Sequence, residues 1–270
     1  MPYANNDGVK IHYEIDGKGP SVILQHGFGS SLESWYDNGY VKGLNQDYRL
    51  ILVDGRGHGT SDKPHDSEAY RADVIARDYT TIMDDLKLNK VIYYGYSMGG
   101  NIGWRCIARY ALPRVSALIS GGSTPYGYTT QAEKHFGEGI TNVIRDAERR
   151  GPEVWVENLL KHGPPVTPEI KARLLKNTDP SALLAHRIAS IEMWPSAVDL
   201  LPQINIPCFV FIGENDAYFP KNKEAVKVLP NAKFVSFPGY DHGETSRDSA
   251  VVLPHIKKFL AEVSKNPTEY

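Results

Sequence analysis

The chain has 270 residues, of which 41% are hydrophobic and 23% are charged, and its formal net charge is −2. A chain of this length can bury a large core without a second independent domain. Because Lys and Arg nearly balance Asp and Glu, the sequence predicts neither a nucleic acid nor a membrane surface as a partner.

The N-terminus and the cysteines bear on location. Residues 1–8 are polar and contain no basic stretch followed by an apolar one, so we expect no signal peptide. No apolar run approaches the roughly 20 residues needed to cross a bilayer. Cys106 and Cys208 lack a zinc-like spacing and are interpreted as small buried side chains. Together these observations predict a cytoplasmic protein.

Short apolar runs separated by turn residues predict a series of β-strands. Residues 9–15 alternate apolar and polar side chains, which is the period of a half-buried strand. Continuously apolar runs, typical of strands buried on both faces, follow at residues 21–25, 48–53, 90–94, 115–120, 208–212 and 233–237.

Helical periodicity appears between these runs, at residues 69–86, 98–110 and 252–263. Because strands alternate with helices, the sequence predicts the α/β class, with a mostly parallel sheet and helices on both faces. Ligands of such sheets bind outside the carboxyl ends of the strands. Side chains that directly follow a strand are therefore the first candidates for a functional site.

Residues 121–201 interrupt the alternation. They contain no apolar strand run, but four helical patterns, at residues 140–149, 153–160, 168–176 and 182–194. We interpret residues 121–201 as a helical cap, or lid, inserted into a core made of residues 1–120 and 202–270. Several aromatic residues of the cap could line a substrate pocket or only pack the cap against the sheet: Tyr126, Tyr128, Phe136, Trp155 and Trp194.

A serine stands between a predicted strand and a predicted helix, in Gly95-Tyr96-Ser97-Met98-Gly99. The pattern G-x-S-x-G in this context is typical of a nucleophile elbow, where a sharp turn exposes the serine Oγ. Glycines two residues to either side relieve crowding in such a turn. The following helix N-terminus leaves unpaired N–H groups beside the serine. Ser97 is the candidate nucleophile.

A serine needs a general base at neutral pH, and nine histidines are available. Most have a structural explanation: His12 lies within a strand, His26 is expected to hydrogen-bond within its loop, and five more lie in loops or on exposed helical stretches (His65, His135, His162, His186 and His255). His242 differs, because it follows the strand 233–237 in a loop before the last helix. It is the candidate base.

The base in turn needs a carboxylate that fixes its tautomer. Asp216 follows the strand 208–212 and is the candidate acid. Glu214 comes too soon after that strand, and Asp241 adjoins His242, so both side chains are expected to point elsewhere. The chain order Ser97, Asp216, His242 is the order found in α/β-hydrolases.

Two glycine-rich segments follow the strands 21–25 and 48–53. In the segment 26–29, the backbone N–H of Phe28 is expected to form an oxyanion hole together with the backbone N–H of Met98. The segment 54–62, DGRGHGTSD, lacks the pattern of a phosphate-binding loop. We interpret it as a tight, hydrogen-bonded turn that supports the site.

Five motifs in this order, HGFG, DGRGHGTSD, GYSMGG, GENDAYFP and PGYDHG, resemble the α/β-hydrolase superfamily, and within it the bacterial carboxylesterase and lactonase branch. The resemblance implies a mostly parallel eight-stranded sheet with a helical cap, and a triad of Ser97, Asp216 and His242. Tyr96 is a departure, because many relatives have histidine there. Dehalogenases and epoxide hydrolases of the superfamily use an aspartate nucleophile, and Ser97 argues against both.

These residues predict hydrolysis of small or medium carboxylic esters through an acyl-enzyme, without a cofactor or a metal. The same triad leaves four alternatives open: a lactonase, a C–C bond hydrolase, a cofactor-free perhydrolase, and a hydrolase-derived ligand receptor with slow turnover. The expected partner is a small ester-like molecule. The choice between them depends on the pocket, which the sequence does not describe.

Overall fold

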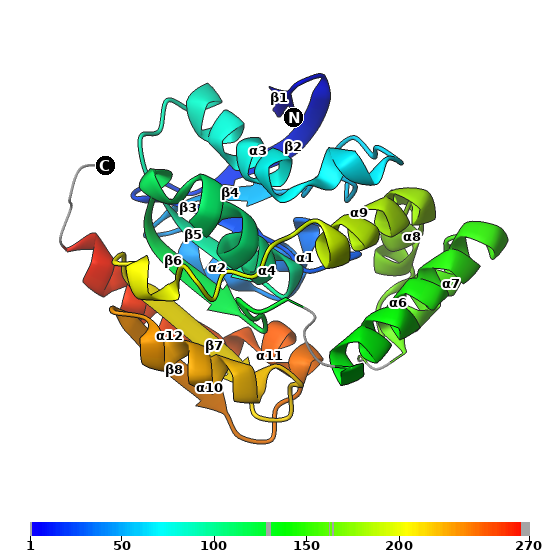
Figure 1. The fold of residues 1–270 in the computed structure, drawn as a ribbon. Helices are drawn as coiled ribbons and strands as arrows, with labels where there is room; N and C mark the ends of the chain where they lie inside the picture. Colours follow the sequence, from blue (N-terminus) through cyan, green and yellow to red (C-terminus); the bar gives the residue numbers. More distant parts are fainter. Residues whose placement is uncertain (1, 128–130, 162, 164, 266–270) are drawn as a thin grey trace.

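The computed structural model describes residues 2–127, 131–161, 163 and 165–265, and for residues 131–136 it describes the backbone only (Figure 1). Its centre is an eight-stranded sheet with the order β1-β2-β4-β3-β5-β6-β7-β8. The strands are β1 (Tyr3–Asn6), β2 (Val9–Asp16), β3 (Ser21–Gln25), β4 (Arg49–Val53), β5 (Val91–Tyr96), β6 (Val115–Gly121), β7 (Cys208–Gly213) and β8 (Ala232–Phe237).

The sheet is mostly parallel, as predicted. β2 pairs with both of its neighbours in the antiparallel direction, and every other pair is parallel. All seven strands predicted from apolar runs are present. The parallel strands β3 to β8 therefore end at one common edge, and the loops that follow them meet there.

The helices begin and end as follows: α1 (Glu33–Asp37), α2 (Tyr40–Leu44), α3 (Ala72–Asp85), α4 (Met98–Ile102), α5 (Ala108–Tyr110), α6 (Gln131–Arg150), α7 (Glu153–Leu160), α8 (Pro168–Asn177), α9 (Pro180–Glu192), α10 (Phe219–Val228), α11 (His242–Arg247) and α12 (Ser249–Ser264). Residues 103–107 form a π-helical turn between α4 and α5, so the helix predicted over 98–110 is continuous. Within the part of the chain described, no helix is both long and apolar enough to span a membrane.

Helices cover both faces of the sheet, which confirms the α/β prediction. One face packs apolar side chains of α3, α4 and α10 against the strands, including Ile75, Ile82 and Ile102. The opposite face packs α1, α2 and α12 through residues such as Trp35, Ile256 and Phe259. Each face buries a separate apolar cluster, so the strands between them are enclosed on both sides.

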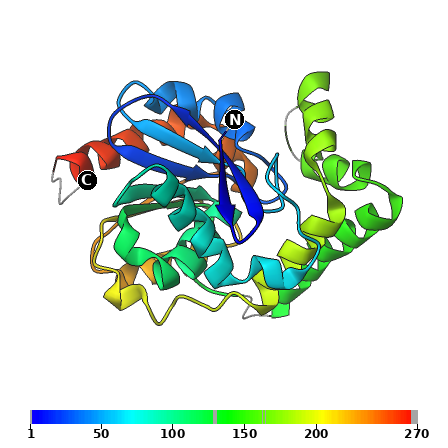
Figure 2. The same ribbon diagram turned by 90° about the horizontal axis from the view of Figure 1, so that it is seen from above.

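The helices α6, α7, α8 and α9 lie together on one side of the sheet in two perpendicular views (Figures 1 and 2). We call these four helices the cap helices. They have a small apolar core of their own around Ile144, Trp155, Val156 and Leu183. The division of the chain into a core and a cap at residues 121 and 201 stays a prediction.

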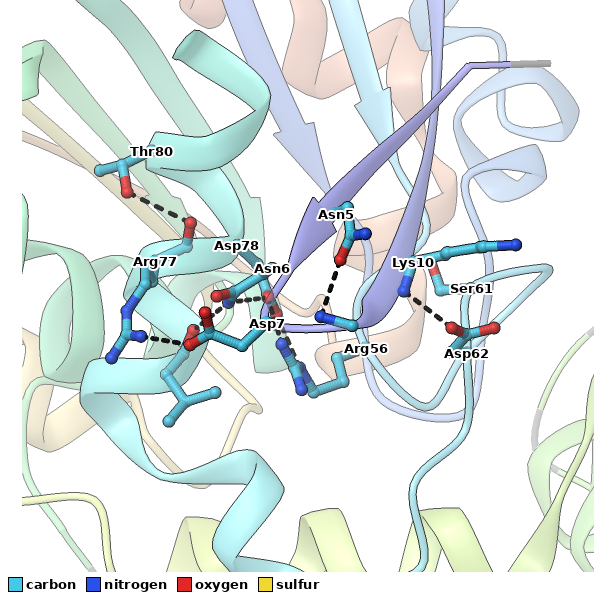
Figure 3. A network of polar contacts seen from close by, with 12 residues as sticks. Asn5, Asn6, Asp7, Lys10, Arg56, Ser61, Asp62, Arg77, Asp78 and Thr80 are labelled. Atoms are coloured by element: carbon cyan, nitrogen blue, oxygen red, sulfur yellow. Dashed lines mark hydrogen bonds and ion pairs between the residues drawn. The ribbon is translucent and has the colours of Figure 1, made fainter. Parts of the chain in front are cut away.

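The loop after β4 is anchored by a buried network of charges (Figure 3). The Arg56 guanidinium donates to both oxygens of Asp78 on α3, at 2.6 and 3.1 Å. The Asn6 side-chain amide, from the N-terminal hairpin, donates to the same carboxylate at 2.6 Å. Because buried charges are stable only when paired and hydrogen-bonded, this network fixes the loop relative to the helix and the hairpin.

Five elements were not predicted, and a sixth extends further than expected. The unpredicted elements are the strand β1 and the helices α1, α2, α10 and α11, and α6 begins nine residues before the predicted Ile140. β1 consists of Tyr-Ala-Asn-Asn and exists because it pairs with β2 at the sheet edge. Pairing of this kind is a tertiary effect that local periodicity does not show.

Candidate active site

Ser97 lies in a strained turn between β5 and α4. Its backbone angles are φ 54° and ψ −111°, an unusual conformation for a residue other than glycine. A Cβ at Gly95 would lie 2.2 Å from the backbone of Gly99, and a Cβ at Gly99 would lie 2.2 Å from the carbonyl oxygen of Gln25. Only glycine fits at these two positions, which explains the spacing of the motif.

The structure brings the three predicted triad residues together. His242 Nε2 lies 2.9 Å from Ser97 Oγ, and His242 Nδ1 lies 2.6 Å from Asp216 Oδ2. Because a carboxylate only accepts, the Nδ1–H donates to Asp216 and leaves Nε2 as acceptor for the serine hydroxyl. This tautomer is the one that a general base beside Ser97 requires.

His242 is the first residue of the helix α11, which corrects the prediction that it lies in a loop. The helix begins there because Asp241 caps it: the Asp241 carboxylate accepts from the backbone N–H of Glu244, and the Glu244 carboxylate accepts from the backbone N–H of Asp241. Asp241 is thus used as a helix cap and does not reach the imidazole.

Asp216 lies in the turn after β7 and is 5% exposed. Its Oδ1 accepts from the backbone N–H of Tyr218 at 2.9 Å, so each carboxylate oxygen has a donor. Glu214, the nearer competitor, accepts a hydrogen bond from the Ser236 hydroxyl on β8 at 2.8 Å. The Glu214 side chain therefore bonds to β8 and not to His242, as expected.

The loop after β3 approaches Ser97 closely enough for a backbone oxyanion hole. A Cβ at Gly27 would lie 3.5 Å from Ser97 Cβ and 3.9 Å from its Oγ. Among the described residues, neither the backbone N–H of Phe28 nor that of Met98 has a hydrogen-bond acceptor. Met98 directly follows Ser97, and Phe28 directly follows Gly27 in the loop after β3, while their role as oxyanion donors stays a prediction.

His26 stabilises this loop through both of its ring nitrogens. Its Nδ1 donates to the carbonyl oxygen of Gly27 at 2.8 Å, and its Nε2 accepts from the backbone N–H of Gly55 at 3.2 Å. Both ring nitrogens are therefore used in loop contacts, as expected for a structural histidine. Burial lowers the pKa of His26, so the neutral ring that this pattern requires is favoured.

The Phe28 side chain packs among rings from the core and the cap helices. Its ring centroid lies 5.4 Å from His58, 5.5 Å from Trp155 on α7 and 5.5 Å from His186 on α9. We call His26, Phe28, His58, Trp155 and His186 the ring cluster, since His26 also contacts His58 at 5.3 Å. The ring cluster joins the candidate oxyanion loop directly to the cap.

His186 is buried, which corrects the prediction that it lies on an exposed stretch. It is 2% exposed, because α9 turns this face toward Tyr70 and Trp194. Burial lowers its pKa to about 3, so the ring is neutral near pH 7. The other histidines in the exposed group include His135 and His162; His162 and the side chain of His135 lie outside the described residues.

The segment 54–62 is a tight hydrogen-bonded turn, as predicted. The Asp54 carboxylate accepts from the backbone N–H groups of Leu32 and Thr60 and lies 2.9 Å from His12 Nδ1. Burial acts to raise the pKa of Asp54, but the hydrogen bonds from His12 and the backbone outweigh it and the pKa is lowered. Asp54 thus joins the loops after β3 and β4.

Two of the cap aromatic residues pack in the interior. Trp155 and Trp194 are both buried, and Trp194 Nε1 donates to the carbonyl oxygen of Tyr70 at 2.7 Å. Tyr126 is half-buried beneath the Lys221 ammonium group, 5.1 Å from its ring centroid. Tyr128 and the side chain of Phe136 lie outside the described residues.

Both cysteines are buried, as predicted. Burial raises the pKa of Cys208 to about 12, so this thiol stays protonated at neutral pH. Within the described part of the chain, no group of three or more His, Cys, Asp and Glu side chains could hold a metal ion.

Comparison with known proteins places this geometry in a family. A family model described as alpha/beta hydrolase fold matches residues 20–147. A Bacillus subtilis protein named "putative 2-succinyl-6-hydroxy-2,4-cyclohexadiene-1-carboxylate synthase" is 30% identical over 96% of this chain and 97% of its own. A non-heme haloperoxidase of Rhodococcus erythropolis is 26% identical over 96% and 99%. A thermophilic esterase of Thermogutta terrifontis superposes with a TM-score of 0.80 at 23% identity, over 97% and 98%.

Proposed function

Because this chain belongs to the α/β-hydrolase family, we propose that it hydrolyses carboxylic esters through an acyl-enzyme intermediate on Ser97. The observation that supports the proposal most directly is the bridge that His242 makes between Ser97, at 2.9 Å, and Asp216, at 2.6 Å. An aspartate nucleophile, which an epoxide hydrolase needs, has no counterpart at this elbow.

In the first half of the reaction, Ser97 Oγ attacks the ester carbonyl carbon while His242 Nε2 takes the hydroxyl proton. The negative charge on the carbonyl oxygen is stabilised by the backbone N–H groups of Phe28 and Met98. The bond from carbon to the alcohol oxygen then breaks, and His242 gives its proton to the departing alcohol. Asp216 stabilises the imidazolium throughout.

In the second half, a water molecule attacks the acyl carbon and His242 Nε2 accepts one of its protons. The bond between the acyl carbon and Ser97 Oγ breaks, and the serine recovers its proton from His242. The products are a carboxylic acid and the free enzyme. No redox step occurs: the ester and one water molecule supply every atom of the alcohol and the acid, and Ser97 and His242 return to their starting protonation states.

A second candidate, perhydrolysis, is favoured by the relative named non-heme haloperoxidase. Hydrogen peroxide would replace water as the nucleophile that attacks the acyl carbon. The product would be a peroxycarboxylic acid, with the same serine released. This reaction uses the same triad and the same oxyanion hole, so the two candidates differ in which small nucleophile reaches the acyl carbon.

The proposal is tested by turnover on p-nitrophenyl esters of graded chain length, with and without hydrogen peroxide. We expect multiple turnovers, a burst of nitrophenol, and loss of both in Ser97→Ala. Ser236→Ala, which removes a hydroxyl on β8 far along the chain from the elbow, is the control and should retain activity. Peroxyacid formed faster than free acid would favour perhydrolysis.

Labelling of Ser97 by a fluorophosphonate measures its nucleophilicity but does not distinguish an enzyme from a slow ligand receptor. Turnover below about one per minute on every ester, far under typical enzyme rates, would overturn the proposal in favour of a receptor. An undiminished burst in Ser97→Ala would exclude Ser97 as the nucleophile.

A further inference from the structure

Tyr96 joins the nucleophile turn directly to the backbone of the candidate base. It is the last residue of β5, precedes Ser97, and is 5% exposed. Its hydroxyl donates to the carbonyl oxygen of His242 at 2.6 Å. This hydrogen bond spans 146 residues of sequence and links the two elements whose relative position sets the distance from Ser97 Oγ to His242 Nε2.

The rings of Tyr96 and His242 also pack on each other. Their centroids are 5.4 Å apart and the planes are tilted by 49°. Gly122, with φ +53°, provides the space for both: a Cβ there would lie 2.7 Å from the Tyr96 hydroxyl and 3.2 Å from His242 Cε1. The arrangement of the two rings therefore depends on a glycine directly after β6.

His242 needs such support because of where it stands. Its side chain is 43% exposed, and it begins a helix of only six residues. Two kinds of contact stabilise α11 internally: the cap made by Asp241 and Glu244, and the hydrogen bond that Thr245 Oγ1 donates to the Asp241 carbonyl oxygen at 2.7 Å. These contacts fix the shape of the helix. The hydrogen bond from the Tyr96 hydroxyl instead fixes the first residue of the helix relative to β5.

We infer that Tyr96 is a positioning residue, which holds His242 at the distance from Ser97 that proton transfer requires. The inference rests on the proposed function for its kinetic consequence. Its structural content is independent of the substrate: without the hydroxyl, the backbone of His242 loses its link to β5, and the imidazole is less well placed for Ser97 and Asp216.

Tyr96→Phe removes the hydroxyl and keeps the ring. On a p-nitrophenyl ester we expect kcat to fall between about tenfold and a hundredfold, as for a small misplacement of a catalytic group, with KM within about twofold of the wild type. Tyr70→Phe is the control, because it removes a buried hydroxyl that donates to the Pro64 carbonyl at 2.7 Å, away from the triad. The control should keep kcat within about twofold.

The second readout is the low-field proton NMR signal of the His242 Nδ1–H that is shared with Asp216, recorded on the free protein. We expect this signal in the wild type and in Tyr70→Phe, and a shifted or broadened signal in Tyr96→Phe. Wild-type kcat, a raised KM at unchanged kcat, or an unmoved signal in Tyr96→Phe would each overturn the inference.

The two proposals fail separately. If the wild type turns over no ester, the proposed function fails, but the NMR comparison still decides the role of Tyr96. If Tyr96→Phe does not fold, as judged by circular dichroism, Gly122→Ala replaces it, because the new Cβ displaces both rings while the hydroxyl remains. Gly239→Ala, at φ +78° with open space around the site, controls for the backbone strain. A normal signal and normal kcat in Gly122→Ala would overturn the inference.

Discussion

Trp155 on α7 lies so close to Gly29 that a Cβ on this glycine would be 2.5 Å from the indole ring. Gly29 directly follows Phe28, whose backbone N–H is a proposed oxyanion donor. The indole also meets the Phe28 ring edge-on, at 5.5 Å between centroids. The contact therefore fixes how the cap helices meet the loop beside Ser97.

Gly29→Ala should reduce ester turnover roughly tenfold or more, because the new methyl group displaces Trp155 or shifts the loop that holds the Phe28 N–H. Gly8→Ala is a matched control: Gly8 also has a positive φ, +89°, but nothing lies within 4 Å of a Cβ there. Both variants carry the backbone strain, so only the collision differs. Equal kcat in the two variants would show that the contact with Trp155 does not affect the site.

Asp216→Asn should lower kcat by about four orders of magnitude, since the amide favours the wrong histidine tautomer while leaving the shape of the side chain unchanged. The matched control is Glu214→Gln, two residues away in the same turn, where the side chain bonds Ser236 and not His242. The control is expected to keep kcat within about a factor of two. Steady-state kinetics on one ester compares them, and a similar loss in both would remove Asp216 from the triad.

The buried His186 should make the protein less stable in mild acid. Burial lowers its folded-state pKa to about 3, below the unfolded value near 6.5, so the unfolded chain binds the extra proton as the pH falls. The free energy of unfolding should then decrease by up to about 1.4 kcal/mol per pH unit from this group between about pH 6 and pH 3.

Urea unfolding of His186→Phe and wild type across this pH range measures the contribution, and the variant should show the smaller loss. His255→Gln serves as control for the replacement of a histidine, because His255 is exposed on α12. Parallel pH profiles for wild type and His186→Phe would contradict the assignment.

The buried pair of Arg56 and Asp78 should be far more sensitive to disruption than pairs on the surface. Arg56→Ala leaves a buried carboxylate without its cation, which costs about 3–5 kcal/mol of unfolding free energy. Arg150→Ala breaks an exposed pair with Asp146 and should cost less than about 1 kcal/mol. Urea unfolding measures both, and a loss below about 1 kcal/mol in Arg56→Ala would show that the network does not anchor the loop.

The three residues of the candidate triad could be predicted because the carboxyl ends of parallel strands lie at one edge of the sheet. Ser97, Asp216 and His242 each follow a strand, so their convergence needed only the strand assignments and the order of the motifs. The two glycines of the elbow were recognisable from the motif, and the structure shows two different neighbours for them: the backbone of Gly99 for Gly95, and the carbonyl oxygen of Gln25 on the adjacent strand β3 for Gly99. Local chemistry and sheet topology were sufficient at these positions.

Burial and helix ends were predicted less well. The sequence predicts an exposed position for His186, but α9 buries it beside Tyr70 and Trp194. The sequence predicts a loop at His242, but the reciprocal hydrogen bonds of Asp241 and Glu244 begin a helix at that residue. His186 is buried by partners on other elements, which its own sequence neighbourhood does not show. The helix that begins at His242 has only six residues, which is too short for a recognisable periodic pattern.

The sequence by itself determined the α/β class, the turn that displays Ser97, and the candidate acid and base that follow later strands, because these depend on local periodicity and on the common edge of parallel strands. Only the tertiary structure decided that Tyr96 bonds the carbonyl of His242, that Trp155 rests on Gly29, and that the ring cluster joins the cap to the loop beside Ser97. Such contacts join residues far apart in the chain, and their formation depends on the angles at which packed helices and strands meet.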